Sequence, residues 1–459
     1  MSVQKWTLYF MPLLIINELR IWHGYCIVYR QIIIVNNMRY FRQALALIRE
    51  EKLYSAMYIA GTALAIAFTM LIAEVYYVKV ADIAPEVNRS RTYYLPNLGM
   101  NSDEGELKSI SQGMFRDLFQ KMQTPECVTG VVNFWSFLQS HMKLADGIHD
   151  CAAKVTITEP GYFNFYHYHF IDGAPFTQDD FDSRRRVCVV TDKVMKKLDG
   201  SDSLILDNRP YHICGVVETP SALTERAFAD IIVPWTAEGL FARFHVRYED
   251  MPVDVSFAVK AGKRKAFMQE LREVEARYNA VHTEEPVDIF SELKSHYATV
   301  WDGLNMLFEV YDGGIWWYVA AAILLLLFVP ALNLSSMVAS RMERRLPEMA
   351  VRKAFGAKRR TLLAQVIMEN LALTLIGGLA GLCIAWMALY GWRDWVFDAF
   401  SDDSTLVDAV PVLKGEMLFG PAVFAIALLV CCVLNVLAAT MPSWLSLRKP
   451  IVESMMIKK

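Results

Sequence analysis

The sequence predicts an α-helical membrane protein with four transmembrane helices and a large extracytoplasmic α+β domain between the first and second of them. Hydrophobic residues make up 54% of the 459-residue chain, and many gather in four stretches that contain no Asp, Glu, Lys or Arg. Each stretch is about as long as the roughly 20 residues that a helix needs to cross a bilayer. The charge-free stretches are 54–73, 315–338, 370–392 and 417–447.

A buried core helix can imitate one such stretch, but four of them in one chain favour membrane helices. A membrane β-barrel would instead show alternating segments of about ten residues, and these stretches do not alternate. The predicted transmembrane helices extend the first three stretches and end the fourth earlier. Their bounds are 54–78, 315–340, 363–392 and 417–442.

Basic residues predict which side of the membrane each loop faces, because Lys and Arg are enriched in cytoplasmic loops. They precede the first helix, separate the second from the third and follow the fourth, whereas the 393–416 loop carries five Asp. Both termini, including the tail 443–459, are therefore expected in the cytoplasm. Residues 79–314 and the short loop 393–416 are expected outside it.

The segment 79–314 is of a size suited to one or two compact folded units. Two stretches, 112–122 and 263–278, have apolar residues at helical spacing. Four runs rich in β-branched residues predict short strands. An α+β domain is therefore expected, with strands at 186–190, 210–217, 230–235 and 254–261.

The chemistry-bearing residues of the chain do not predict an enzyme. His167 and His169 lie two residues apart and would project from one face if the segment were a strand, but a zinc site needs further ligands nearby, so a packing or rim role is favoured. The sequence holds no G-x-x-x-x-G-K-[ST] phosphate-binding loop. We therefore expect no catalytic residue, metal or cofactor in this chain.

The cysteines of the external segment leave two possibilities open. An oxidising compartment permits disulfides, whereas cysteines inside apolar strand patterns are typical of buried thiols, which are favoured here. The four cysteines in question are Cys127, Cys151, Cys188 and Cys214.

The cytoplasmic loop 341–362 is strongly basic, with eight Lys or Arg against two Glu between 341 and 361. Pro347 suits the first position of a short helix and Gly356 suits the residue just past its end. A second helix is expected to start near Lys358 and to run without a break into the third membrane span. Binding of anionic lipid explains the charge, but the helix-Gly-helix layout favours a docking element.

Three passages resemble FtsX/MacB-type ABC transporter permeases. “RMERRLPEMAVRKAFGAKRRTLLAQVIMENLALTLIGGLAGL” is similar to the family's basic loop and the glycine-rich helix that follows it, and “MPSWLSLRKPIVESM” is similar to its ending, where a proline-bearing turn leaves the membrane. “TEPGYFNFYHYHFIDGAPFTQDD” resembles the external core domain of MacB-like members. The resemblance runs from about Met38 to the C-terminus and is looser between 88 and 130.

The resemblance implies a bacterial inner (plasma) membrane protein whose cytoplasmic loop contacts an ABC ATPase. The sequence before the first helix holds no ATPase domain, so a separate subunit is expected to bind ATP and magnesium. Membrane lipids and a periplasmic adaptor or cargo are further expected partners, and nucleic acid is not. The residues expected to couple the loop to the ATPase are Arg344, Leu346, Glu348, Arg352, Lys353, Phe355 and Gly356.

The same resemblance implies a second permease subunit, identical or different. Gly377 and Gly381 lie four residues apart in the third membrane span, a spacing that lets helices approach closely.

Residues 1–37 depart from the family pattern, because their apolar runs are too short or too interrupted to span a membrane. Residues 38–53 predict an amphipathic, basic, cytoplasmic helix. We therefore expect translation to begin at Met38.

The leading functional prediction is a permease subunit of an ABC-type exporter or extractor that moves its external domain when a partner hydrolyses ATP. An FtsX-like scaffold that regulates an external cell-wall hydrolase and a membrane sensor remain as alternatives. The sequence does not choose among peptide, lipid, lipoprotein and drug substrates.

Overall fold

The computed structural model describes residues 52–100, 106–133, 139–143, 150–221, 224–240, 248–307, 314–391 and 421–448. The extension 1–37, nearly all of the amphipathic helix 38–53, the loop 393–416 and the end of the tail lie outside the described residues. The chain divides into two compact units. A helical unit comprises Met1–Ile72, Ala320–Ala388 and Pro421–Lys459, and an external unit comprises Ala73–Val319 and Leu389–Gly420.

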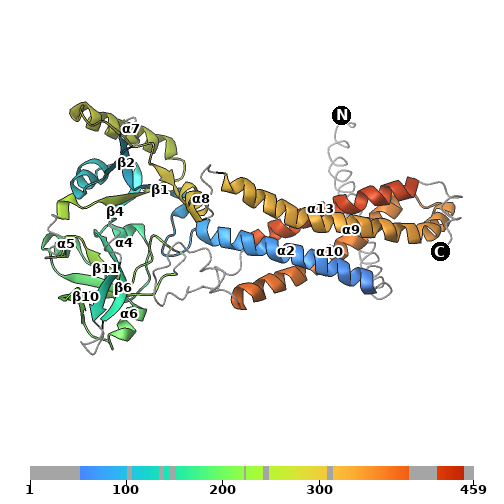
Figure 1. The fold of residues 1–459 in the computed structure, drawn as a ribbon, viewed down its shortest axis with the longest axis horizontal. Helices are drawn as coiled ribbons and strands as arrows, with labels where there is room; N and C mark the ends of the chain where they lie inside the picture. Colours follow the sequence, from blue (N-terminus) through green and yellow to red (C-terminus); the bar gives the residue numbers. More distant parts are fainter. Residues whose placement is uncertain are drawn as a thin grey trace, which may run out of the picture. The chain divides into compact units, whose positions relative to one another are not determined.

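Four long helices make up the described part of the helical unit and run alongside one another (Figure 1). Within the described residues, three helices are long and apolar enough to cross a membrane, and the fourth, α9, has a shorter apolar stretch at Trp316–Leu325. The predicted fold class, membrane helices with a large α+β domain after the first of them, is confirmed. The helices are α2 (Lys52–Val80), α9 (Ile315–Ala354), α10 (Arg359–Gly391) and α13 (Pro421–Arg448).

The structure corrects the predicted start of a short helix at Pro347. Helix α9 runs without a break through Pro347 to Ala354. Proline in a helix interior removes one hydrogen bond and crowds the preceding turn. Packing outweighs this local cost, because Leu346, Met349 and Ala350 are buried within the helical unit.

Pro442 provides a second correction. A proline-bearing turn was expected to end the fourth membrane helix near this residue, but α13 continues through it to Arg448. The buried Ser443 lies on the same turn. Residues 443–448 therefore continue the helix instead of following a turn.

The external unit is built on an 11-stranded sheet of order β11-β8-β10-β9-β5-β6-β4-β12-β1-β14, with β7 beside β10. Strand β11 also pairs with β6, so the strands from β11 to β6 close into a ring. The β8–β10 and β6–β11 pairs are parallel, and the other described pairs are antiparallel. Strands β13, β2 and β3 form a second, smaller sheet.

The strands have the following bounds: β1 Thr92–Leu95, β2 Asn97–Met100, β3 Leu107–Ser109, β4 Pro125–Val132, β5 Gln139–Lys143, β6 Asp150–Thr158, β7 Phe170–Gly173, β8 Val187–Thr191, β9 Ser203–Leu206, β10 Arg209–Val217, β11 Ile231–Pro234, β12 Val253–Val259, β13 Val287–Asp288 and β14 Lys294–Ser295. The helices of this unit are η1 Arg89–Arg91, α3 Gln112–Met114, η2 Phe115–Phe119, α4 Tyr162–Phe165, α5 Gln178–Asp182, α6 Asp192–Lys197, η4 Tyr248–Asp250, α7 Arg264–Val281 and α8 His296–Leu307.

Two apolar clusters hold the external unit together. The larger one joins β8 and β12 to α7, whose Phe267, Leu271 and Val274 are buried at helical spacing. The smaller one is aromatic and centres on Tyr162, Phe165, Tyr166 and Phe176. All four predicted strands are present as β8, β10, β11 and β12, and the predicted helix 263–278 is α7.

The four external cysteines are free thiols in this structure. Cys188 is fully buried on β8, and burial raises the pKa of its thiol well above the ordinary value. Burial likewise raises the pKa of Cys127 and of Cys214 to about 11. Thiols with such pKa values are almost entirely protonated at neutral pH and behave as packing groups.

Candidate functional site at the α9–α10 hairpin

The turn between α9 and α10 is closed by a glycine in the left-handed conformation. Gly356 has φ +92°, and its N–H bonds to the carbonyl of Lys353 at 3.1 Å. The N–H of Ala357 bonds to the carbonyl of Arg352 at 3.0 Å. These two bonds form a Schellman motif, which satisfies carbonyls at the end of α9. The chain therefore reverses within a few residues, and α10 begins at Arg359.

A buried carboxylate on α10 ties the two helices together behind this turn. Glu369 is only 2% exposed and accepts hydrogen bonds from Arg345 at 2.9 Å and from Gln365 at 3.0 Å. A second guanidinium of α9, that of Arg341, lies 4.0 Å from the same carboxylate and packs on the ring of Tyr54 from α2. One carboxylate thus holds α9 against α10, and its second arginine reaches α2.

The polar contacts continue from Glu369 toward the turn. Arg352 donates to Gln365 at 3.1 Å and to Glu348 at 2.6 Å. Arg345 also lies 3.8 Å from Glu348. A chain of hydrogen bonds therefore runs along the hairpin, from the exposed Glu348 near its end to the buried Glu369.

An apolar cluster supports the same hairpin. Its buried members come from α9, α10 and α13, so three helices meet there. They are Val338, Met342, Met349, Leu362, Val366 and Ala439.

The predicted coupling residues divide into three groups. Phe355 is 88% exposed, and Arg344 and Gly356 are exposed as well. Glu348 and Arg352 pair with each other and brace the hairpin, while Lys353 is half-buried. Leu346 is 2% exposed and packs inside the helical unit, so it does not lie on a contact surface, and its coupling role stays a prediction.

The two predicted packing glycines lie against α2 of the same chain. A side chain at Gly377 would meet Thr62 at 2.9 Å, and one at Gly381 would meet the carbonyl oxygen of Ala63 at 2.5 Å. These glycines therefore serve close packing within one subunit, and α2 occupies the surface that was expected to face a second permease.

Hydrogen bonds between polar side chains connect the helices near these glycines. Tyr58 of α2 lies 3.0 Å from the hydroxyl of Thr374, which also accepts a bond from Asn435 of α13 at 3.1 Å. In hydrocarbon such polar groups need partners inside the protein. The network therefore fixes α2, α10 and α13 in one arrangement.

Sequence reasoning missed Glu369, Gln365 and Arg341 as members of this site. A signal was present, because an ionisable residue at the start of a membrane helix is expensive unless it is paired. Its partners on α9 lie 24 and 28 residues away, so no local pattern identifies them.

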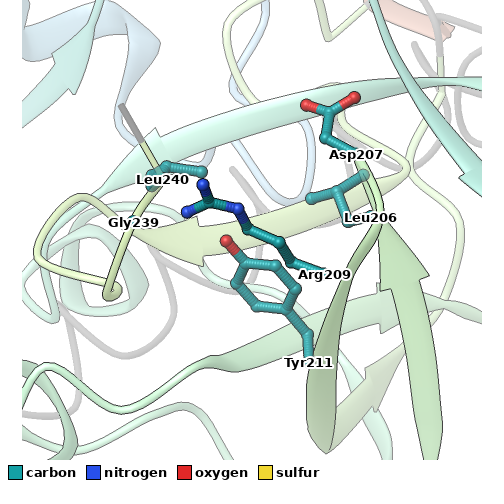
Figure 2. Close-up of a pocket in the computed structure, with 6 residues that line it drawn as sticks. All are labelled: Leu206, Asp207, Arg209, Tyr211, Gly239 and Leu240. Atoms are coloured by element: carbon teal, nitrogen blue, oxygen red, sulfur yellow. The ribbon is translucent and has the colours of Figure 1, made fainter. Parts of the chain in front are cut away.

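Within the described residues, the external unit offers no metal site. No group of three or more His, Cys, Asp or Glu able to hold a metal occurs there, and His169 is highly exposed beside Glu218. Figure 2 shows a small pocket in which the guanidinium of Arg209 lies between Gly239 and Tyr211. Its volume of about 60 Å³ is small beside the roughly 300–1,000 Å³ of typical ligand pockets.

Two families match this chain. The MacB-like periplasmic core domain family matches residues 55–274, and the FtsX-like permease C-terminal family matches residues 320–451. The chain is an FtsX-like permease with a MacB-like periplasmic core domain. This assignment confirms the resemblance found in the sequence, and it makes the external unit of the permease periplasmic.

Curated relatives of the permease are ABC transporter proteins. The uncharacterized ABC transporter permease YknZ of Bacillus subtilis is 22% identical over 371 residues, which cover 76% of this chain and 87% of that protein. The pyoverdine export ATP-binding/permease protein PvdT of Pseudomonas aeruginosa is 27% identical over 223 residues, 47% of this chain and 31% of that protein. The permease is therefore an ABC transporter permease of the MacB/FtsX type.

Solved structures similar to the permease include the extracellular domain of YknZ from Gram-positive bacteria, at 18% identity and a TM-score of 0.33, covering 43% of this chain and 98% of that domain. The periplasmic region of MacB from Actinobacillus actinomycetemcomitans aligns at 12% identity and a TM-score of 0.34, covering 48% of this chain and 94% of that region.

Replacing Glu369 tests the buried ion cluster. Glu369→Ala leaves two arginines without their carboxylate, and breaking such a buried pair costs about 3–5 kcal/mol. We expect a clear fall in the midpoint of thermal unfolding of the purified permease. Glu369→Gln should cost less, because its amide oxygen still accepts a bond from Arg345. The control is Glu343→Ala on the exposed face of α9, and equal stability of Glu369→Ala and this control would contradict the assignment.

Replacing Gly381 tests the close approach of α10 to α2. The new methyl group of Gly381→Ala would lie 2.5 Å from a backbone oxygen, so the helices must separate and the unfolding midpoint should fall. Gly61→Ala on α2 is the matched control, since nothing lies within 4 Å of its added carbon. Alanine favours a helix by about 1 kcal/mol over glycine, so the control should be unchanged or more stable. A Gly381→Ala protein as stable as the Gly61→Ala protein would rule out the contact.

Proposed function

We propose that the permease docks a separate ABC ATPase subunit on the α9–α10 hairpin and converts ATP binding and hydrolysis there into movement of its periplasmic domain. The observation that carries this proposal is Phe355, a phenylalanine 88% exposed at the end of a long helix. Exposed aromatic side chains in a rigid setting are typical anchors of protein interfaces.

The surroundings of Phe355 fit a protein partner better than a lipid surface alone. Lys358, Arg359 and Arg360 are exposed just beyond the turn, and each basic residue near an anionic membrane contributes about 1 kcal/mol to attraction. Lipid attraction accounts for these charges. It does not account for an exposed ring on a closed turn, whereas aromatic and arginine side chains together are enriched in protein interfaces.

The inside of the hairpin supports transmission of a push at Phe355. Two hydrogen bonds join α9 to α10. Arg352 donates to Gln365, and Arg345 donates to Glu369, which also accepts from Gln365. Helix α10 then continues from Arg359 to Gly391 without a break. A displacement of the turn is therefore expected to reach the membrane helices as a rigid movement rather than to be lost in a flexible loop.

The ATPase subunit would hold ATP and magnesium, because this sequence has no Walker phosphate-binding loop. The name of PvdT joins an ATP-binding and a permease function in one protein, and the region similar to this chain covers 31% of that protein. We infer export as the direction of transport, with both termini of the chain in the cytoplasm. A second permease subunit would contact surfaces other than Gly377 and Gly381, which α2 fills.

Phe355→Ala tests the docking role. Removing an anchor of this kind typically weakens an interface by about 2 kcal/mol or more, so the ATPase should bind roughly thirtyfold more weakly and much less of it should co-purify with the permease. The fold should be unaffected because the ring touches little of its own chain. The measurement is the ratio of ATPase to permease after mild detergent purification, with the unfolding midpoint recorded in parallel.

Val281→Ala is the matched control, an exposed apolar residue (77%) at the end of α7 in the periplasmic unit. It should retain the wild-type ratio. Full ATPase recovery with Phe355→Ala would refute docking at the hairpin.

A further inference from the structure

The end of the first membrane helix is capped by two side chains from elsewhere in the periplasmic unit. A helix leaves its last carbonyls without partners along its own backbone. Arg89 donates to the carbonyl of Val78 at 2.7 Å and to that of Ala81 at 3.1 Å, and the Nε2 of His296 lies 2.8 Å from the carbonyl of Lys79. A guanidinium in this position also opposes the negative end of the helix dipole.

Arg89 is itself held by a buried carboxylate. Its Nε donates to Glu86 at 2.6 Å, and both side chains are 2% exposed. The other oxygen of Glu86 accepts the backbone N–H groups of Arg226 and Ala227, at 3.0 and 2.9 Å. Burial would raise the pKa of Glu86, but the charge and hydrogen bond of Arg89 outweigh it and hold the pKa below its ordinary value. The carboxylate therefore stays ionised and joins α2 to the segment just before β11.

His296 brings the returning chain to the same place. It is the first residue of α8, which follows β14, and its Nδ1 lies 3.2 Å from the hydroxyl of Tyr94 on β1. Tyr76 lies three residues before Lys79 in α2, and Trp301 lies five residues after His296 in α8. The centroids of their rings are 5.3 Å apart. The end of α2 and the start of α8 are thus held side by side.

A second, half-buried ion pair lies beside this contact. The guanidinium of Arg226 lies over the ring of Tyr94 at 4.7 Å and donates to Asp254 of β12 at 3.3 Å. Burying so many charges is costly, and pairing them is weak support for stability as such. Their common effect is geometric, because His296 joins the end of α2 and the start of α8 to Tyr94 on β1, and Arg226 joins the segment before β11 to Asp254 on β12.

We propose that Glu86, Arg89 and His296 form a rigid joint that fixes the last turn of α2 and the first turn of α8 to the sheet, so that a displacement of these helices moves the periplasmic domain as one body. This inference rests on the proposed function. It assigns three positioning residues that lie far from the hairpin in the sequence.

His296→Ala tests the joint in the full permease purified with its ATPase subunit. The variant loses the contacts to Lys79 and Tyr94, so exchange of the Ala81 amide, which bonds to Tyr77 at 2.7 Å, should speed up roughly tenfold. ATPase recovery should be unchanged. The difference in periplasmic-domain hydrogen exchange between the ATP-bound and nucleotide-free complexes should be lost.

Two further variants separate a joint from a merely stabilising residue. His296→Gln can still donate to Lys79 and accept from Tyr94, so it should restore the nucleotide-dependent difference. His169→Ala removes a highly exposed histidine of the same domain and should behave as wild type. A His296→Ala protein that keeps the full nucleotide-dependent difference would overturn the proposal.

A cross-link gives an answer even if His296→Ala does not fold. In a background without native cysteines, Tyr76→Cys and Trp301→Cys are joined by a short thiol-specific cross-linker. A rigid joint predicts that the cross-linked complex keeps its nucleotide-dependent exchange difference. Loss of the difference on cross-linking would show that α2 and α8 move against each other and would overturn the proposal.

The outcomes distinguish this proposal from the proposed function. If the wild-type permease recovers no ATPase, or shows no nucleotide-dependent difference, the proposed function fails first and the joint fails with it. If the wild type shows both and His296→Ala also shows both, the joint alone fails.

Discussion

The organisation of the helical unit depends on the pairing of the Glu369 carboxylate with the guanidinium groups of Arg345 and Arg341. A single buried negative charge faces Arg345 and Arg341, and the second of these rests on Tyr54. Without the carboxylate, two guanidinium groups would remain in a water-poor interior, where an unpaired charge is far more costly than an unpaired neutral group. The position of the hairpin is thereby fixed by charge pairing as well as by apolar packing. The exposed turn with Phe355 owes its rigidity to this pairing.

The periplasmic unit solves a related problem at the other end of α2. At that end, the last carbonyls of the helix have no partners along their own backbone and need hydrogen-bond donors. Arg89 and His296 supply them, and Glu86 holds Arg89. Both arrangements place charged or polar side chains from other parts of the fold at helix ends. Each braces the end of a helix, as the proposed transmission of movement requires.

The parts of this structure that sequence predicts are those set by local composition. Charge-free stretches predict membrane helices because a bilayer imposes length and polarity on each segment separately, and Gly356 ends α9 because the left-handed turn favours glycine. Pro347 was predicted to begin a helix by a local rule, and packing of Leu346 and Met349 overrode it. The spacing of Gly377 and Gly381 predicts a close helix contact but not its partner, which proved to be α2. Glu369 was missed since its arginine partners lie 24 and 28 residues away. Glu86 pairs with the nearby Arg89, but the helix end and the backbone N–H groups that this pair holds are brought to it only by folding.

Site-specific photo-cross-linking would show whether the turn at Phe355 touches an ATPase subunit. A benzophenone amino acid replaces Phe355 in the full permease, and native membranes are irradiated before solubilisation. If the hairpin is the docking surface, a cross-linked product that contains an ABC ATPase chain should form, and the same probe at Val281 should not give it. Cross-links from position 355 to lipid alone, in membranes that contain the ATPase, would refute docking at the hairpin and return the basic loop to a role in membrane anchoring.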